Sequence, residues 1–136
     1  MSGVAVVDAN VCVAWLLNEP NGSLLTEALA NFRVIVLPIW RSEVCNALLK
    51  SERRRQSSRD QVNIAAGIMD NLPIDEMRVA AEATAELLVD FTRPHQLSAY
   101  DATYVALAVE QSATLFTCDS NMIAAAGRLG VAVETA

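Results

Sequence analysis

The sequence predicts an α/β fold in which helices cover both faces of a parallel sheet. Short apolar runs typical of buried parallel strands alternate along the chain with segments whose apolar residues recur at helical spacing. The 136 residues fit one domain, 1–136, which can bury roughly two-thirds of the surface of its unfolded chain. With 53% hydrophobic residues, the chain is expected to be globular rather than disordered.

The first half of the chain is expected to form two strands and four helices. The strands are the mostly apolar runs at residues 4–8 and 33–37. The turn residues Glu19-Pro20-Asn21-Gly22 separate the first two helices. The helices are expected at 10–18, 23–32, 39–55 and, after a connector at 57–60, in the segment that ends near residue 71.

The second half continues the alternation. A short strand is expected at 72–75, and the repeat of Val79, Ala83, Leu87 and Phe91 at every fourth position then predicts a helix buried on that side. Its opposite, exposed face would carry Glu82, Glu86 and Asp90. The remaining expected elements are a loop at 92–97, a helix at 99–111, a strand at 113–119, a helix from 120 or 121 to Gly127 or Gly130, and a strand at 131–133.

Composition disfavours several classes of protein. The net charge of −6 is not typical of nucleic-acid binders, although acids that hold divalent cations would contribute to it without repelling a substrate. Cys12, Cys45 and Cys118 are widely spaced and odd in number, which indicates reduced thiols. The absence of a CxxC motif and the single histidine, His95, disfavour a zinc site.

Membrane insertion and nucleotide-dependent function are also disfavoured. No apolar run approaches the roughly 18 residues that a membrane span requires, and the N-terminus lacks the basic segment of a signal peptide. We therefore expect a cytoplasmic protein. The sequence contains no P-loop, no dinucleotide-binding fingerprint and no Gly-x-Ser-x-Gly motif.

Four acids stand where strands end or helices begin. Asp8 and Asp119 end apolar runs, and Glu43 and Asp101 lie near the fronts of helices. Each alone could simply cap or start a helix, and Ser98 three residues before Asp101 fits the capping-box spacing. Together they could face one pocket, because ligands of open α/β sheets bind at the carboxyl ends of the strands. Some of these acids would then stay protonated unless a cation balanced them.

An all-carboxylate pocket would suit Mg²⁺ or Mn²⁺, which prefer oxygen ligands. Such ions activate water and neutralise phosphate charge, so the expected reaction is hydrolysis of a phosphodiester or phosphomonoester. A polar stripe along the helix at 39–55 leaves two interpretations open. It is either a solvated face or a track for substrate phosphates that ends at Glu43. The stripe consists of Glu43, Asn46, Lys50, Arg53 and Arg54.

Four segments together resemble the PIN-domain ribonucleases, and their length and order are similar to the VapC-type toxins of toxin–antitoxin pairs. The resemblance covers essentially the whole chain. The segments are Val7-Asp8-Ala9-Asn10, Ser42-Glu43-Val44-Cys45-Asn46-Ala47-Leu48 after Pro38, Tyr100-Asp101-Ala102-Thr103-Tyr104-Val105-Ala106-Leu107-Ala108, and Leu115-Phe116-Thr117-Cys118-Asp119.

The resemblance implies a three-layer α/β/α sandwich with a mostly parallel central sheet. It implies that Asp8, Glu43, Asp101 and Asp119 are the catalytic and metal-binding acids. Thr117 and Asn46 match polar positions beside them, and Asn10 stands where a serine or threonine is common. It further implies cleavage of RNA (tRNA or rRNA by analogy) with Mg²⁺ or Mn²⁺, a cognate VapB-type antitoxin and a homodimer.

Two alternatives remain open at this level. One is a PIN-like nuclease of RNA processing or repair without an antitoxin, and the other is a non-catalytic module whose acids bind a partner's arginines. For the toxin, we expect the antitoxin to contact the helices from Ile39 to Asn71, beside the basic residues Lys50, Arg53 and Arg54. Trp15, Phe32 and Trp40 are candidates for an exposed apolar patch at a dimer interface.

Overall fold

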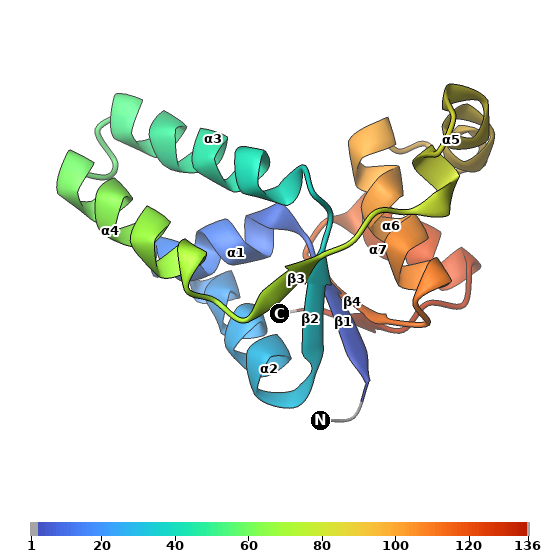
Figure 1. The fold of residues 1–136 in the computed structure, drawn as a ribbon, viewed down its shortest axis with the longest axis horizontal. Helices are drawn as coiled ribbons and strands as arrows, with labels where there is room; N and C mark the ends of the chain where they lie inside the picture. Colours follow the sequence, from blue (N-terminus) through green and yellow to red (C-terminus); the bar gives the residue numbers. More distant parts are fainter. Residues whose placement is uncertain (1–2, 136) are drawn as a thin grey trace.

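A computed structural model describes residues 3–135, and its centre is a five-stranded parallel sheet (Figure 1). The strand order is β3-β2-β1-β4-β5, and every neighbouring pair is parallel. The predicted parallel sheet is therefore confirmed. The strands are β1 (Val4–Val7), β2 (Arg33–Val36), β3 (Ile74–Glu76), β4 (Thr114–Phe116) and β5 (Val133–Glu134).

Seven α-helices and three short 3-10 helices connect these strands within the described residues. The α-helices are α1 (Ala9–Leu16), α2 (Ser23–Asn31), α3 (Trp40–Arg53), α4 (Arg59–Asp70), α5 (Ala85–Thr92), α6 (Ala99–Glu110) and α7 (Ser120–Arg128). The 3-10 helices are η1 (Pro20–Gly22), η2 (Ala80–Glu82) and η3 (Arg93–His95). None of the helices between residues 3 and 135 is long and apolar enough to cross a membrane.

The sheet separates two hydrophobic cores, because successive strand residues point to opposite faces. Ala5 and Val7 of β1 pack with α1, α2, α3 and α4, whereas Val6 packs with α6 and α7. Val34 and Val36 of β2 likewise belong to the first core. Figure 1 shows the two groups of helices on either side of the sheet. This arrangement confirms the three-layer α/β/α sandwich.

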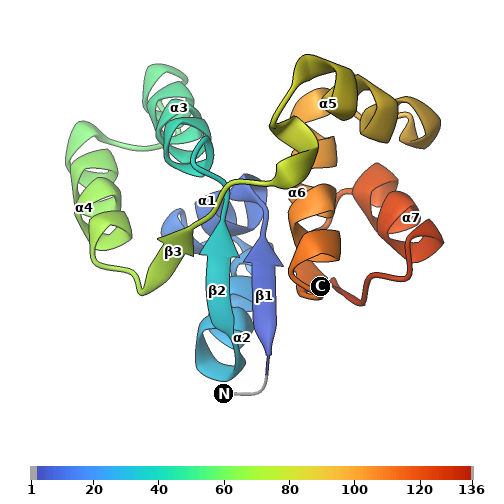
Figure 2. The same ribbon diagram turned by 45° about the vertical axis from the view of Figure 1, so that its right-hand side comes forward.

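The order in which the strands are added to the sheet reverses at β1. Strands β2 and β3 extend to one side of β1, and β4 and β5 to the other. Crevices at such switch points, at the carboxyl ends of the strands, are where open α/β sheets bind ligands. Asp8 follows β1 at this edge, and Thr117 to Asp119 follow β4. Figure 2 shows β1 and β2 pointing toward the space between α3 on one side and α5 and α6 on the other.

The repeat from Val79 to Phe91 predicts one continuous helix, and this prediction is wrong. The structure breaks it into η2 and α5, because Thr84 is extended and its Oγ1 accepts a hydrogen bond from the Leu87 amide (3.1 Å). A threonine that caps a helix in this way competes with a continuous helix. Val79 is buried as expected, but Leu87 is 50% exposed. The exposed positions of Glu82, Glu86 and Asp90 are confirmed.

The proposed exposed patch of aromatic residues is also wrong. Trp40 is 2% exposed and belongs to the first core. Phe32 is partly buried and packs edge-on against Phe116, with ring centroids 5.4 Å apart. Trp15 is partly buried, and its indole nitrogen donates to the Thr26 hydroxyl (3.2 Å). The predicted ends of the other elements agree with the structure to within a few residues, which is the usual uncertainty of such boundaries.

Candidate active site

Asp8 serves both as a helix cap and as a pocket residue. It follows β1, is 5% exposed, and its Oδ1 accepts a hydrogen bond from the Val11 amide (3.0 Å) at the start of α1. Its other oxygen accepts a hydrogen bond from the hydroxyl of Thr117, a fully buried residue that follows β4. The two interpretations of Asp8 are therefore compatible, because one oxygen caps the helix while the carboxylate faces the pocket.

Asp119 has a parallel role at the end of β4. Its Oδ1 accepts from the Met122 amide (2.9 Å) and caps α7. The amide of Asp119 donates to Thr117 Oγ1 (3.1 Å), while the same hydroxyl donates to Asp8. Thr117 therefore joins the carboxylate of Asp8 to the backbone of Asp119.

Glu43 and Asp101 approach from the first turns of α3 and α6. The Tyr104 hydroxyl donates to Glu43 Oε1 (2.5 Å). Ser98 caps α6 by accepting from the Asp101 amide (3.1 Å), so Asp101 itself is not the cap. Its side chain is therefore free of the capping role considered for it.

These four acids line one pocket of about 220 Å³. The predicted amides Asn10 and Asn46 line it too, whereas Thr117 lies behind it. Lys50, Arg53 and Arg54 are exposed farther along α3 or just past its end and do not line the pocket. Its lining consists of Asp8, Ala9, Asn10, Glu43, Asn46, Asp101, Tyr104, Asp119 and Met122.

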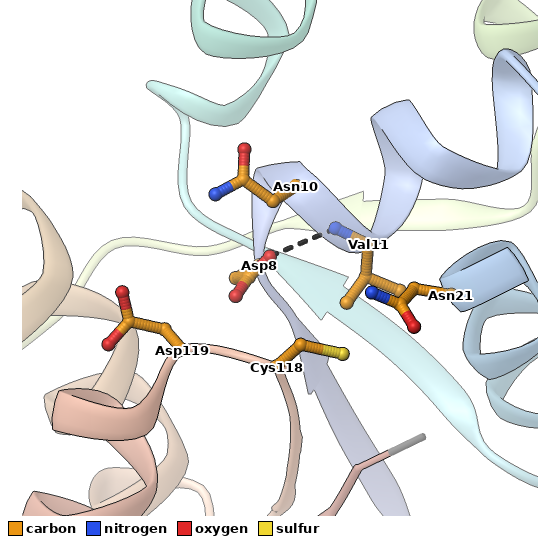
Figure 3. Close-up of a pocket in the computed structure, with 6 residues that line it drawn as sticks. All are labelled: Asp8, Asn10, Val11, Asn21, Cys118 and Asp119. Atoms are coloured by element: carbon orange, nitrogen blue, oxygen red, sulfur yellow. Dashed lines mark hydrogen bonds between the residues drawn. The ribbon is translucent and has the colours of Figure 1, made fainter. Parts of the chain in front are cut away.

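A second hollow of about 180 Å³ adjoins the first, since Asp8, Asn10 and Asp119 line both. Figure 3 shows Cys118 between Asp119 and Asn21, with its sulfur pointing toward Asn21. In the same view Asn10 and Asp119 lie on two sides of Asp8, and all three residues line both hollows. The exposed Cys118 thiol therefore lies at the mouth of the acidic site.

Burial and mutual repulsion raise the pKa of three of the acids. Burial is the largest cause for Asp8, and the charge of Asp101 adds to it, although hydrogen bonds from Thr117, Val11 and Asn10 lower this pKa. Burial and the charges of Asp101 and Asp8 raise the pKa of Glu43, which the Tyr104 hydroxyl lowers.

Asp101 shows the same effect. Burial and the charge of Asp119 raise its pKa, and the neighbouring Ser98 side chain lowers it. The pocket thus concentrates negative charge that a bound cation would stabilise.

The donor types fit a hard cation. All four acids offer oxygen atoms, and Mg²⁺ typically keeps several waters while it binds one or two carboxylates. Within residues 3–135, no three His, Cys, Asp or Glu side chains are gathered closely enough to hold a metal ion by themselves. The pocket residues therefore fit an ion that retains much of its water shell or draws the carboxylates inward.

Two residues at the site, Tyr104 and Cys118, are not among the site residues expected from the sequence. Tyr104 stands in one of the four segments of the resemblance without an assigned role, yet its hydroxyl contacts Glu43. Its position three residues after Asp101 places both on one face of the helix, and a buried tyrosine hydroxyl usually requires a partner. Cys118 was interpreted only as a reduced thiol, and its position directly before Asp119 was the available signal.

A family model described as the PIN domain matches residues 5–128 of this chain. The match spans all four acids that line the pocket. A search of curated proteins found no match.

Solved structures share the fold at low sequence identity. VapBC2 from Rickettsia felis bound to a DNA fragment from its promoter is 17% identical, with 96% of this chain and 97% of that chain covered and a TM-score of 0.65. PAE2754 from Pyrobaculum aerophilum is 18% identical, with coverage of 98% and 85% and a TM-score of 0.70. FitAcB from Neisseria gonorrhoeae is 16% identical, with coverage of 95% of both chains and a TM-score of 0.64.

Proposed function

The chain belongs to the PIN domain family, and we propose that it is a metal-dependent endoribonuclease that hydrolyses RNA phosphodiester bonds. PIN domains are nucleases. The single observation that carries the proposal is the pocket where Asp8, Glu43, Asp101 and Asp119 converge from four separate segments at the carboxyl edge of the sheet. The raised pKa values of three of these acids support a site that is completed by a cation.

In the proposed reaction, carboxylates among these four acids would hold Mg²⁺ or Mn²⁺, which would keep part of its water shell. When bound, such an ion supplies a reactive water at neutral pH and neutralises charge on the scissile phosphate. Thr117 fixes the Asp8 carboxylate from behind, and Tyr104 fixes Glu43. The amides of Asn10 and Asn46 line the pocket and can donate hydrogen bonds to a phosphate oxygen or a water.

The decisive experiment is cleavage of total cellular RNA by purified protein with Mn²⁺, with EDTA, and with the variant Asp8→Asn. An asparagine can still accept from the Val11 amide, so the helix cap is kept while the charge is lost. Discrete fragments from wild type with Mn²⁺ alone are expected. Cleavage by both Asp8→Asn and Asp101→Asn that is unchanged from wild type would sink the proposal.

We also propose that the protein is the toxin of a toxin–antitoxin pair, as in the VapC-type toxins that its sequence resembles. The similarity to the fold of VapBC2 is compatible with this role. The hairpin of α3 and α4 exposes Leu49, Ile64 and Ile68 by 44%, 64% and 42%. A groove of about 270 Å³ beside them is lined by Leu16, Leu17, Asn18, Gln56, Ser57, Gln61, Ile64, Ala65 and Ile68.

An amphipathic antitoxin segment would place its apolar side chains in this groove. The exposed residues Lys50, Arg53 and Arg54 remain candidates for contact with RNA phosphates. A protein encoded by a small neighbouring open reading frame should bind wild type and lose affinity for Ile64→Asp. Val109→Asp on α6, another exposed apolar residue, is the matched control.

Failure to find such a protein, together with intact cleavage, would favour a nuclease of RNA processing or repair. A melting temperature unmoved by Mn²⁺ would instead favour a non-catalytic binding module. The proposed homodimer would use a surface other than the buried Trp40. Leu87 and Val89 on α5 are 50% and 49% exposed and offer one such surface, which light scattering of wild type and Leu87→Asp would test.

A further inference from the structure

A groove of about 780 Å³ lies next to the acidic pocket and has no role in the proposed function so far. Its volume is within the roughly 300–1,000 Å³ of typical ligand sites. Ile39 and Ser42 at the start of α3 form one wall, while Glu43 and Asn46 on the adjoining side of the same helix face the acidic pocket. The full lining is Pro38, Ile39, Ser42, Arg78, Val79, Ala80, Glu82 and Ala83.

The other wall runs from Arg78 through η2 to Ala83, and its first part, between β3 and η2, is anchored at both ends. The Met77 amide donates to the Val36 carbonyl (2.8 Å) at the end of β2. The Glu110 carboxylate accepts from the amides of Ala80 (2.8 Å) and Ala81 (3.1 Å). The segment that bears Arg78 is therefore held in place before any ligand binds.

Packing directs the side chains of this segment. Val79 is 4% exposed and packs in the same core as Tyr104, which lines the acidic pocket. Arg78 itself is exposed and lines the groove. The groove and the acidic pocket are thus lined by adjacent positions of α3, Ser42 and Glu43, so a chain bound at one site can extend to the other.

The polar side chains of the groove have no partners within the described part of the chain. Among residues 3–135, the side chains of Ser42, Arg78 and Glu82 form no hydrogen bond or ion pair. Arg41, beside Ser42 on α3, differs because it pairs with Asp70 (2.7 Å) and Glu76 (3.6 Å). The groove therefore offers one free cation, one free carboxylate and one free hydroxyl beside apolar surface.

We propose that this groove is a nucleotide subsite for single-stranded RNA, which rests on the proposed ribonuclease function. Arg78 binds a backbone phosphate next to the scissile one. Glu82 and Ser42 bind the hydrogen-bonding edge of the base, and Ile39 and Ala83 contact its apolar surface. A simple anion would be repelled by Glu82 and a simple cation by Arg78, whereas a nucleotide offers both an anionic phosphate and amino-group donors. Single-stranded RNA is favoured because its base edges are accessible.

The test measures binding of fluorescent single-stranded RNA 10-mers by anisotropy over a range of salt concentrations. All proteins carry Asp101→Asn and Mn²⁺, and a gel verifies that the RNA stays intact. Arg78→Gln should weaken binding to every sequence and reduce the slope of log Kd against log salt by about 0.7, the value for one lost phosphate contact on a single strand. Arg78→Lys should retain most of the slope, because its charge is kept.

Two further variants complete the design. Arg33→Gln is the charge-matched control, since Arg33 begins β2 at the opposite edge of the sheet and its exposed ion pair with Asp75 contributes little to stability. Glu82→Gln should leave the salt slope unchanged and alter the preference among oligo(A), oligo(C), oligo(G) and oligo(U). An equal effect of Arg78→Gln and Arg33→Gln would overturn the subsite.

The outcomes separate this proposal from the nuclease proposal. If wild type cleaves RNA but Arg78→Gln binds RNA no differently from Arg33→Gln, the nuclease proposal stands and the subsite proposal fails. If wild type cleaves no RNA but the salt dependence of RNA binding still depends on Arg78, the nuclease proposal fails and the single-stranded RNA site stands.

Discussion

Tyr104 on α6 donates a hydrogen bond to Glu43 on α3, with 2.5 Å between Oη and Oε1. The tyrosine is 1% exposed and packs in the core between the sheet and α6 and α7, while its hydroxyl lines the acidic pocket. Burial, followed by this hydrogen bond and the charge of Glu43, raises the pKa of Tyr104, so the hydroxyl stays protonated and can donate. One oxygen of Glu43 is thereby held by the protein, and the other is the one available to a cation.

Tyr104→Phe should keep the core packed and weaken Mn²⁺ binding. Loss of a group that orients a metal ligand typically lowers metal affinity or activity about 10–100-fold, and the phenylalanine ring preserves the apolar contacts. Titration of Mn²⁺ followed by electron paramagnetic resonance measures the affinity directly. Tyr100→Phe on the same helix, where the side chain is 64% exposed, is the control. Identical affinities for both variants would contradict the positioning role of Tyr104.

The metal-free protein should lose stability between about pH 4 and neutral pH. The folded-state pKa values of Asp8, Glu43 and Asp101 are raised. Their contribution to stability is therefore fully present below the unfolded-state values of about 4 and is lost as the pH rises through the raised folded-state values. Melting temperatures in EDTA should fall across this range.

Asp8→Asn serves as the control for this pH dependence, because it removes one of the three charges. Its melting temperature in EDTA should exceed that of wild type at pH 7.5, and the difference should shrink toward pH 4. Mn²⁺ at pH 7.5 should stabilise wild type more than the variant. A constant difference at every pH would exclude Asp8 as a source of the effect.

Much of the fold was predictable because its signals are local. The runs that form β1 and β2 are apolar on both faces, so both faces must be buried. A parallel sheet with helices on both sides buries them. Parallel strands place all their carboxyl ends at one edge, so Asp8 and Asp119 could be expected to lie close together. The structure shows both lining one pocket with Glu43 and Asp101.

The features that the sequence does not predict depend on contacts between residues far apart in the chain. The spacing of Val79 and Leu87 suits one helix, but Glu110 binds the amides that start η2 and Thr84 caps α5, so the helix is divided. The contact of Tyr104 with Glu43 joins residues 61 positions apart. Spacing within one helix cannot predict which hydroxyl of another helix reaches a given carboxylate.

Cys118 should react first with alkylating reagents, and its modification should inhibit cleavage. It is exposed at the mouth of the acidic site, whereas Cys12 is fully buried and burial raises the pKa of its thiol to about 12. A maleimide on Cys118 would occupy the hollow that Asp8 and Asp119 share. Mass spectrometry would identify the modified residue, and Cys118→Ser should retain cleavage after treatment. Full activity of protein with modified Cys118 would show that substrate does not approach along this side.

Two glycines should respond to alanine in opposite directions. A Cβ on Gly22 would lie 2.6 Å from the Trp15 Cα and 2.8 Å from its nitrogen, so Gly22→Ala must push η1 away from α1. Such overpacking typically costs about 1–3 kcal/mol. Gly67 is exposed within α4, and a Cβ there meets no atom within 4 Å, so Gly67→Ala should stabilise the protein by roughly 0.5–1 kcal/mol.

Urea denaturation of the two glycine variants would compare their free energies of unfolding. A destabilised Gly22→Ala that still cleaves RNA would show that the contact between η1 and α1 serves stability alone. A greater loss of cleavage than of folded protein would show that it also positions Asp8 and Asn10, because the start of α1 carries Asn10 and is capped by Asp8. An unchanged free energy of unfolding for Gly22→Ala would instead show that η1 can move away from α1 at little cost.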